Sequence, residues 1–285
     1  MARLQERELS KPYRFPSQER FGKKGSGASF CVPPFLIRSI VPLLVVILWE
    51  VLSRAGLVAD NLLPAPATVA VTILEMVQDG SLWSHVGITL YRVLIGFVIG
   101  TAAGVVFGAL VGVNRTVEQL FDTSIQALRS VPSIAWVPLF ILWFSIGESS
   151  KITLIAVGVF FPVYLNTVSG IRNVDRKLIE VGQVYRFSAY EHIRRIVLPA
   201  SLPSFLVGLR SGLGLGWMFV VAAELMGASE GLGYLLVFGQ NTSAPQLIIS
   251  SLILFAVLGK CTDAVLKGVE RKALHWQDGL PQKGK

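Results

Sequence analysis

Apolar residues gather in six long runs along this chain, and polar segments separate the runs. Each run holds about 20 residues, the length that a helix needs to cross the hydrocarbon core of a bilayer. The predicted spans are 35–55, 91–113, 125–145, 151–171, 204–226 and 246–267. Pro132 and Pro138 interrupt the third run, which predicts a kink or a short helix along the membrane surface. The pattern predicts an all-α polytopic membrane protein with six transmembrane helices.

Two of these runs carry glycine at every fourth position. The second run has Gly96, Gly100, Gly104, Gly108 and Gly112, and the fifth run has Gly208, Gly212 and Gly216. Residues four apart lie on one face of a helix. Each row therefore predicts a groove into which another helix packs closely. We interpret both rows as packing features without chemistry of their own.

Basic residues are distributed unevenly between the runs. Eight basic and three acidic residues lie between the N-terminus and Arg38, whereas segment 57–90 has three acidic residues and no Lys or Arg. The next long loop, 172–203, has six basic and three acidic residues. The segment between the fifth and sixth runs has Glu230 and no base, and the C-terminal tail is basic again. Because cytoplasmic loops are rich in Lys and Arg, the alternation predicts that both termini are cytoplasmic.

The chain is expected to have three parts. Residues 1–34 are polar and without periodicity, which predicts a cytoplasmic, disordered basic arm that can lie near anionic lipid headgroups. Residues 35–270 form the transmembrane domain, and residues 271–285 form a cytoplasmic tail. The polar segment before the first run is too long for a cleaved signal peptide, so this run is expected to remain as a membrane anchor.

The composition agrees with a membrane protein. Hydrophobic residues make up 52% of the chain and charged residues 15%, whereas soluble domains carry about 25% charged residues. The net charge of +8 does not indicate nucleic-acid binding, because the bases lie at the ends and in loops. Cys31 and Cys261 lack metal-type spacing, and His85, His192 and His275 are scattered. No metal site is predicted.

Few ionisable residues lie in or near the spans: Arg92, Arg210, Glu224, Lys260 and Asp263. Charges inside a membrane are costly and often functional. Long side chains near an interface can, however, extend to the headgroups. We interpret Arg92 and Lys260 in this second way. For Arg210 and Glu224 a water-filled pathway and an interfacial position both stay open.

Loop 172–203 has a helical pattern of its own. Apolar residues recur at helical spacing from Leu178 to Tyr185, and a break follows near Ser188. A second helical segment then ends at Pro199. Such an amphipathic helix pair fits either a groove on a partner protein or the surface of a bilayer. The periodicity does not decide between the two.

The same loop resembles the EAA signature of permease subunits of bacterial ABC importers. The signature reads Glu-Ala-Ala, three residues, Gly and later a hydrophobic residue, any residue, Leu and Pro. The matching positions here are Glu180, Val181, Gly182, Arg186, Val197, Leu198 and Pro199. Arg186 stands where the family has Gly, which would permit a left-handed turn between the short helices. Arginine there would either strain that turn or force a different one.

Further segments resemble the sulfonate, taurine and nitrate branch of these permeases, closest to the aliphatic sulfonate group. They are LLPAPATV at 62–69 and segments 125–152, 160–185, 198–210 and 222–236. The resemblance implies a type I ABC importer permease fold in which 172–203 is a cytoplasmic coupling-helix loop, called the coupling loop here. It implies aliphatic sulfonates as the substrate, with taurine, nitrate or another small solute as alternatives.

The resemblance also implies the partners of a bacterial inner-membrane importer. These are a second copy of the permease in a homodimer, two ATPase subunits, a solute-binding protein outside the membrane and the lipid bilayer. The residues implied in coupling to the ATPase are Glu180, Val181, Gly182, Tyr185, Arg186, Ser188, Leu198 and Pro199. The chain lacks a G-x-x-x-x-G-K-[ST] phosphate loop. ATP and Mg are therefore assigned to the partner ATPase, and this chain is expected to be no enzyme and to bind no cofactor.

A pathway for a small anion needs hydrogen-bond donors and weak positive potential without a deep binding well. The candidates for its lining are Ser130, Ser133, Trp136, Asn166, Arg210, Trp217 and Glu224. A self-sufficient channel or secondary transporter would instead show acidic or Na⁺-binding residues near the midplane and inverted repeats. A membrane-embedded enzyme would need clustered catalytic groups within the spans. Neither pattern is clear in the sequence.

Overall fold

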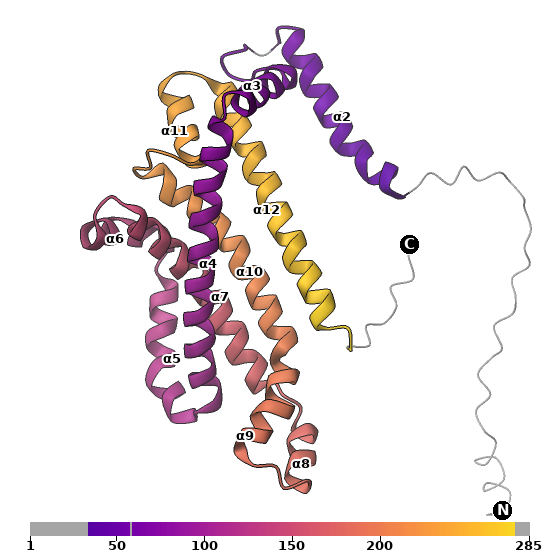
Figure 1. Cartoon of the computed structure of the whole chain (residues 1–285), viewed down its shortest axis with the longest axis vertical. Helices are drawn as coiled ribbons and strands as arrows, with labels where there is room; N and C mark the ends of the chain where they lie inside the picture. Colours follow the sequence, from indigo (N-terminus) through magenta and orange to yellow (C-terminus); the bar gives the residue numbers. More distant parts are fainter. Residues whose placement is uncertain (1–33, 58, 277–285) are drawn as a thin grey trace, which may run out of the picture. The chain divides into compact units, whose positions relative to one another are not determined.

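The chain is helical over most of the residues that its computed structural model describes, which are 34–57 and 59–276. No strand occurs among these residues, in agreement with the predicted all-α class. The helices, labelled as in Figure 1, are α2 (Pro34–Arg54), α3 (Pro66–Gln78), α4 (Ser81–Val113), α5 (Arg115–Ser130), η1 (Ser133–Trp136), α6 (Val137–Phe144), α7 (Glu148–Arg172), α8 (Arg176–Val184), α9 (Ala189–His192), η2 (Ile193–Val197), α10 (Leu198–Leu225), α11 (Leu232–Asn241) and α12 (Pro245–Ala273). Internal contacts divide the chain into residues 1–46 and 47–285, so α2 has residues in both units and helices α3 to α12 lie in the second.

Four helices in the described part are long and apolar enough to cross a membrane. They are Ser81–Val113, Glu148–Arg172, Ala189–Leu225 and Pro245–Ala273. Each contains most of one predicted span, the second, fourth, fifth and sixth respectively. The predicted first span, 35–55, coincides with α2, a helix of 21 residues that is not among these four. Six transmembrane helices are therefore not all confirmed.

The predicted third span, 125–145, is not one continuous helix. Its first half belongs to α5 and its second half to η1 and α6, and an angle of 86° separates Thr123–Ser130 from Ile134–Phe144 on either side of Pro132. Val131 is extended, as the residue before a proline usually is. The predicted kink is confirmed, and the pair forms either a broken span or a re-entrant loop. With this pair counted as one, the described residues hold up to five spans.

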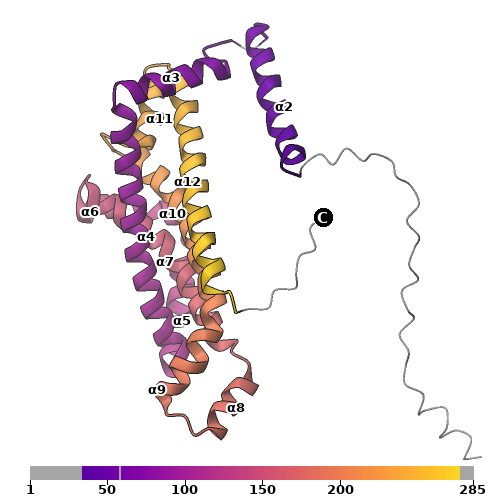
Figure 2. The same ribbon diagram turned by 45° about the vertical axis from the view of Figure 1, so that its right-hand side comes forward.

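Helix α7 runs beside both α4 and α10 (Figure 2). Both glycine rows face α7. A Cβ atom at Gly100 would lie 2.4 Å from the carbonyl oxygen of Ala156. In the row of α10, a Cβ atom at Gly208 would lie 2.7 Å from Cβ of Asn166. Both distances are too short for non-bonded atoms. The predicted close packing is therefore confirmed, and α7 is the shared partner of both rows.

The apolar core follows from this arrangement. Ile155, Val159 and Val163 of α7 are fully buried and pack with Val93 of α4 and Val220 of α10. Helix α12 differs, because only 11% of its apolar window is buried within the chain. Exposed apolar side chains on a membrane helix can face lipid tails, which are as apolar as leucine. The core thus consists mainly of α4, α7 and α10.

The two ends of this bundle carry different features (Figure 1). Helices α3 and α11 lie at one end, called the α11 end here, and the coupling loop with α8 and α9 lies at the other. All but the last residue of the predicted arm, 1–34, and most of the predicted tail, 271–285, lie outside the described residues, as does Cys31. These assignments stay predictions.

Candidate functional site

The coupling loop folds as two short helices separated by one tight turn. The Asp175 side chain caps α8 by accepting a hydrogen bond from the Lys177 N–H. Ser188 caps α9 and forms a reciprocal capping box with Glu191. Both caps satisfy backbone N–H groups that a helix start leaves unpaired. The predicted break near Ser188 is thus confirmed as the start of α9.

Arg186 sits in the turn in the left-handed conformation, with φ at 54°. Its N–H donates to the Gln183 carbonyl at 2.9 Å, and the Phe187 N–H donates to the Gly182 carbonyl at 3.0 Å. These two bonds form a Schellman motif, which usually has glycine at the left-handed position. The sequence left open whether arginine strains this turn or forces a different one. In the structure the left-handed turn is kept, at a conformational cost of about 1–2 kcal/mol for a residue with a Cβ.

Gly182 lets α8 pack against the segment that follows the turn. A Cβ atom there would lie 2.6 Å from His192 Nε2 and 2.6 Å from Ile196 Cδ1. His192 Nε2 also lies 3.2 Å from the Ile179 carbonyl oxygen. The Phe187 ring meets the His192 ring edge-on. The two arms of the loop are therefore closely joined.

The coupling loop exposes several large apolar side chains. Val184 is 81% exposed and Tyr185 71%, and Leu178, Val181 and Tyr190 are also exposed. Exposed apolar side chains grouped in this way are typical of a surface that another molecule covers. Basic residues flank them, since Arg176, Lys177, Arg194 and Arg195 are also exposed.

The residues predicted to couple to the ATPase take several positions in this loop. Glu180 is exposed and pairs with Arg176 at 3.4 Å, an i, i+4 surface pair. Val181 and Tyr185 belong to the exposed apolar surface, whereas Gly182 is buried at the helix contact. Leu198 and Pro199 are exposed at the start of α10. Their role in coupling stays a prediction.

The second arm of the loop runs into α10 without interruption. Ala189–Leu225 forms one helix of 37 residues, with a π-helical turn at Ile193–Val197. A single π-helical turn inside an α-helix is rare and is frequently found at functional sites. Pro199 and Pro203 follow within α10, each without a backbone donor. The coupling loop is therefore joined directly to the membrane helix that packs on α7.

Arg92 lies in an ion network toward the α11 end of the bundle. Its guanidinium donates from Nε to Glu148 Oε2 at 2.7 Å and from Nη2 to Glu148 Oε1 at 2.6 Å. Nη1 donates to Glu224 Oε1 and to the Glu230 carbonyl oxygen, both at 2.7 Å. The Arg92 side chain is only 2% exposed. The expectation that Arg92 extends to the membrane interface is therefore wrong, because oppositely charged partners compensate its burial.

Glu224 is the most buried acid of this network, with a fully buried side chain. Besides Arg92, it accepts hydrogen bonds from Thr89 Oγ1 at 2.8 Å and from the Gly233 N–H at 2.7 Å. A Cβ atom at Gly233 would lie 2.5 Å from the Glu224 Cβ, so glycine allows this approach. The network ties α10 and the start of α11 to α4.

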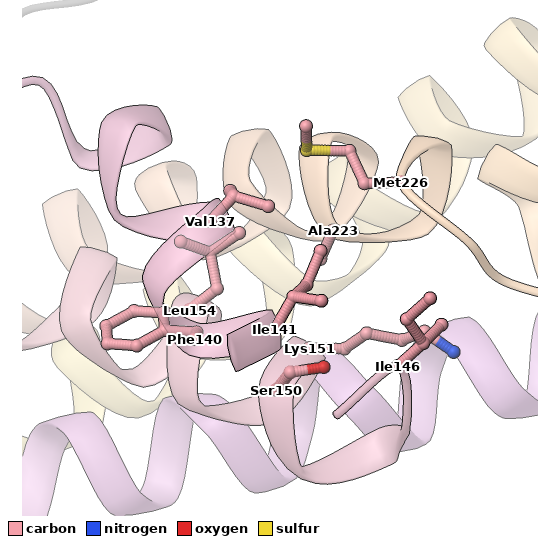
Figure 3. A pocket seen from close by; sticks show the side chains of 9 residues that line it. All are labelled: Val137, Phe140, Ile141, Ile146, Ser150, Lys151, Leu154, Ala223 and Met226. Carbon is pink, nitrogen blue, oxygen red and sulfur yellow. The ribbon is translucent and has the colours of Figure 1, made fainter. Parts of the chain in front are cut away.

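Lys151 extends the network to a second cation. Its Nζ lies 3.1 Å from Glu148 Oε1, and its side chain is 8% exposed. The stem of Lys151 lines a small apolar hollow between α6, α7 and α10, and Figure 3 shows its amine beside Ile146. Two cations and two carboxylates therefore meet here: Arg92, Lys151, Glu148 and Glu224.

Among the described residues, no hydrogen bond or ion pair joins two of the predicted pathway residues. Ser130 bonds the Gln126 carbonyl on its own helix, and Asn166 bonds the Pro162 carbonyl on its own helix. The side chain of Ser133 lies outside the described ones. Trp136 is stacked on Phe140.

The other pathway candidates link α10 to its neighbours. Arg210 forms two hydrogen bonds to Asp263 of α12, at 2.6 and 3.1 Å, and stays partly exposed. Trp217 donates to Thr262 of α12 at 2.9 Å. Glu224 is enclosed in the ion network. Lining of a pathway by these residues stays a prediction.

Sequence reasoning missed Glu148 and Lys151. Both lie at the beginning of an apolar run, where charges usually mark the edge of a span. One signal was present, because an acid and a base three residues apart share a helix face. The pairing with Arg92 had no signal, since Glu148 is 56 residues away in the sequence.

Comparisons with known proteins identify the family of this chain. A family model described as "binding-protein-dependent transport system inner membrane component" matches residues 96–275. A candidate aliphatic sulfonates transport permease protein of Bacillus subtilis (strain 168), SsuC, is 43% identical over 84% of this chain and 87% of its own length. The SsuC protein of Escherichia coli (strain K12), which carries the same description, is 41% identical over 83% of this chain and 90% of its own.

A solved structure shares the fold. A chain of the MetNI methionine ABC transporter, described in inward-facing conformations, superposes with a TM-score of 0.58. The match covers 65% of this chain and 92% of that one, at 19% sequence identity. At this identity the similarity concerns the fold alone, which is that of a type I ABC importer permease.

Proposed function

Because the chain belongs to the family of binding-protein-dependent transport system inner membrane components, we propose that it conducts aliphatic sulfonates into the cell. It is a multi-pass permease subunit of an ABC importer, a family in which a separate subunit hydrolyses ATP. The observation that carries the choice of substrate is the identity of 43% and 41% to two SsuC proteins over most of the chain.

The assembly that we propose contains two copies of this chain, two ATPase subunits and a solute-binding protein. Both termini and the coupling loop lie on the cytoplasmic side, as the distribution of basic residues favours. The α11 end then faces the solute-binding protein. ATP and Mg are bound by the ATPase subunits.

We propose that the coupling loop docks on the ATPase. Its exposed apolar side chains, of which Val184 and Tyr185 are the most exposed, supply contact area. Glu180 and the flanking basic residues set the register, because charges at the rim of an interface orient a partner. The alternative of an amphipathic helix on the bilayer is less favoured, since Gly182 joins the two arms into one compact unit.

The continuous helix from the loop into α10 supports a mechanism for coupling. Movement of the docked loop displaces α9 and, through the π-helical turn, α10. Helix α10 packs along α7, and α7 packs along α4, so the displacement reaches the core of the bundle. Discrete rearrangement of packed helices is how such motions open a pathway on alternate sides.

Growth on defined sulfur sources tests the substrate. We expect a strain without this chain to lose growth on ethanesulfonate as the sole sulfur source and to keep normal growth on sulfate. Restoring the chain should restore growth. Parallel cultures with taurine as the sulfur source and nitrate as the nitrogen source distinguish the alternative solutes. Unchanged growth of the deletion strain on every alkanesulfonate would contradict the proposal.

A further inference from the structure

We propose that Arg92 and Lys151 form a binding site for the anionic group of the transported solute, and that Glu148 is a resident carboxylate that occupies this site in the solute's absence. The inference rests on the proposed function, since it assigns a place for a sulfonate within this chain. The two carboxylates of the network differ in exposure. The Glu224 side chain is fully buried, whereas the Glu148 side chain is 44% exposed.

Arg92 bonds the buried Glu224 with one nitrogen and the partly exposed Glu148 with the other two. Nη1 is held by Glu224 and by the Glu230 carbonyl, so the guanidinium keeps its position without Glu148. Nε and Nη2 both point to Glu148, at 2.7 and 2.6 Å. Lys151 Nζ is the third donor to this carboxylate, at 3.1 Å. Withdrawal of Glu148 would therefore free three donors that are already in place.

These donors suit a tetrahedral oxyanion. The edge of a guanidinium matches two oxygens of a carboxylate or of a tetrahedral phosphate. A sulfonate is also tetrahedral and has three oxygens, one for each freed donor. Because two of the donors belong to a buried, fixed guanidinium, the anion would meet a preorganised site.

Charge favours a monoanion. Arg92 and Lys151 carry +2 and Glu148 and Glu224 carry −2, so the four groups sum to zero. Without the Glu148 carboxylate the sum is +1, and burial strengthens the attraction of this charge. A sulfonate, with one negative charge, restores neutrality. Sulfate, with two, leaves an excess negative charge.

The surroundings of Lys151 suit the organic part of such a solute. Ile146, Leu154 and Met226 line the hollow along which the lysine stem runs (Figure 3). Its volume of about 10 Å³ is enough for one water, so the hollow must widen to take an alkyl group. Its wall includes α6, which ends at Phe144 and follows the bend at Pro132.

A resident carboxylate also fits the requirements of transport. A pathway site must attract the solute and still release it, and a deep binding well would trap it. Glu148 competes with the solute for the same donors and thereby lowers its net affinity. We therefore expect neutralising Glu148 to strengthen binding and to slow transport.

The test uses the purified permease–ATPase complex without the solute-binding protein, in a buffer free of sulfonates. Equilibrium binding of radiolabelled ethanesulfonate is compared between the wild type and Glu148→Gln. We expect at least about tenfold tighter binding in the variant, a typical size for coupling between competing groups. Ethanesulfonate should also bind more tightly than sulfate, and choline should not bind.

Two variants serve as controls. Glu118→Gln neutralises an acid that also pairs with an arginine, Arg172, and it should leave binding unchanged. Lys151→Met in the Glu148→Gln background should abolish the gain. Equal binding by Glu148→Gln and the wild type, or an equal gain in Glu118→Gln, would overturn the inference.

Two further measurements keep the outcome interpretable. If Glu148→Gln does not fold, ethanesulfonate should still raise the melting temperature of the wild type and not that of Lys151→Met, and equal shifts would contradict the site. Transport by the wild-type complex with its solute-binding protein is measured in parallel. Sulfonate transport without the predicted gain refutes only this inference, whereas absence of sulfonate transport refutes the proposed function.

Discussion

The ion network buries polar groups that all have partners, whereas the coupling loop exposes apolar side chains. In the network, Arg92 and Glu224 are buried, and each has charged and backbone partners within hydrogen-bond distance. In the coupling loop, Val184 and Tyr185 expose most of their apolar surface. Buried polar groups must be paired inside the protein, whereas exposed apolar groups gain free energy only when another molecule covers them. The first region therefore fixes the fold, and the second is available to a partner.

The largest expected effect comes from breaking the network. Arg92→Ala would leave the Glu224 carboxylate buried without its cation. Removing one partner of a buried ion pair costs about 3–5 kcal/mol. We expect a loss of this size in the free energy of unfolding, measured by titration with a denaturing detergent in mixed micelles.

Arg210→Ala is the matched control for this loss. Arg210 also pairs with an acid, Asp263, but its side chain is 43% exposed. The Asp263 side chain is itself 30% exposed, so the remaining carboxylate is not enclosed as Glu224 is, and we expect a smaller loss of stability. Equal losses for the two variants would show that burial does not distinguish the pairs.

A smaller effect is expected at the contact between α4 and α7. Gly100→Ala places a Cβ atom 2.4 Å from the Ala156 carbonyl oxygen, so the two helices must move apart. Overpacking of this kind costs about 1–3 kcal/mol. The measurement is the same detergent titration, and the variant should unfold at a lower detergent fraction than the wild type.

Gly87→Ala provides the control on the same helix. A Cβ atom at Gly87 meets no atom within 4 Å. The substitution therefore changes stability only through the higher helix propensity of alanine. We expect this variant to be as stable as the wild type or more stable by up to about 1 kcal/mol. A destabilisation equal to that of Gly100→Ala would argue against the close contact.

The smallest effect on stability is expected in the coupling loop. The double variant Glu180→Ala, Tyr185→Ala changes two exposed side chains, so the free energy of unfolding should shift by no more than about 0.5 kcal/mol. If the loop docks on the ATPase, the variant should nevertheless lose most of the ATPase that co-purifies with it. The proportion of the two subunits in the purified complex measures this.

The control for co-purification uses the same residue types elsewhere. Glu75→Ala, Tyr91→Ala also changes an exposed acid and an exposed tyrosine, away from the coupling loop. This variant should keep its ATPase. Full retention of ATPase by the coupling-loop variant would remove the basis for the proposed docking.

Several features were predictable from the sequence because they depend on neighbours along the chain. Apolar runs predicted four of the spans within the described residues. The glycine rows in two of these runs indicated that α4 and α10 each pack closely against another helix, which is α7. Pro132 indicated the bend in the third span, although not its angle of 86°. The helical pattern and the break near Ser188 indicated the two arms of the coupling loop.

Other features were decided only by the tertiary structure. Arg92 meets Glu148 and Glu224 across 56 and 132 residues of sequence, so its partners depend on the register in which α4, α7 and α10 pack. The conformation of Arg186 was also left open by the sequence, and in the structure its turn is closed by local bonds, from the Arg186 N–H to Gln183 and from the Phe187 N–H to Gly182. Periodicity and composition specify which face of a helix is apolar, and hence that the chain is a helical membrane protein. They do not specify which distant polar groups meet, because that depends on how whole helices are placed against one another.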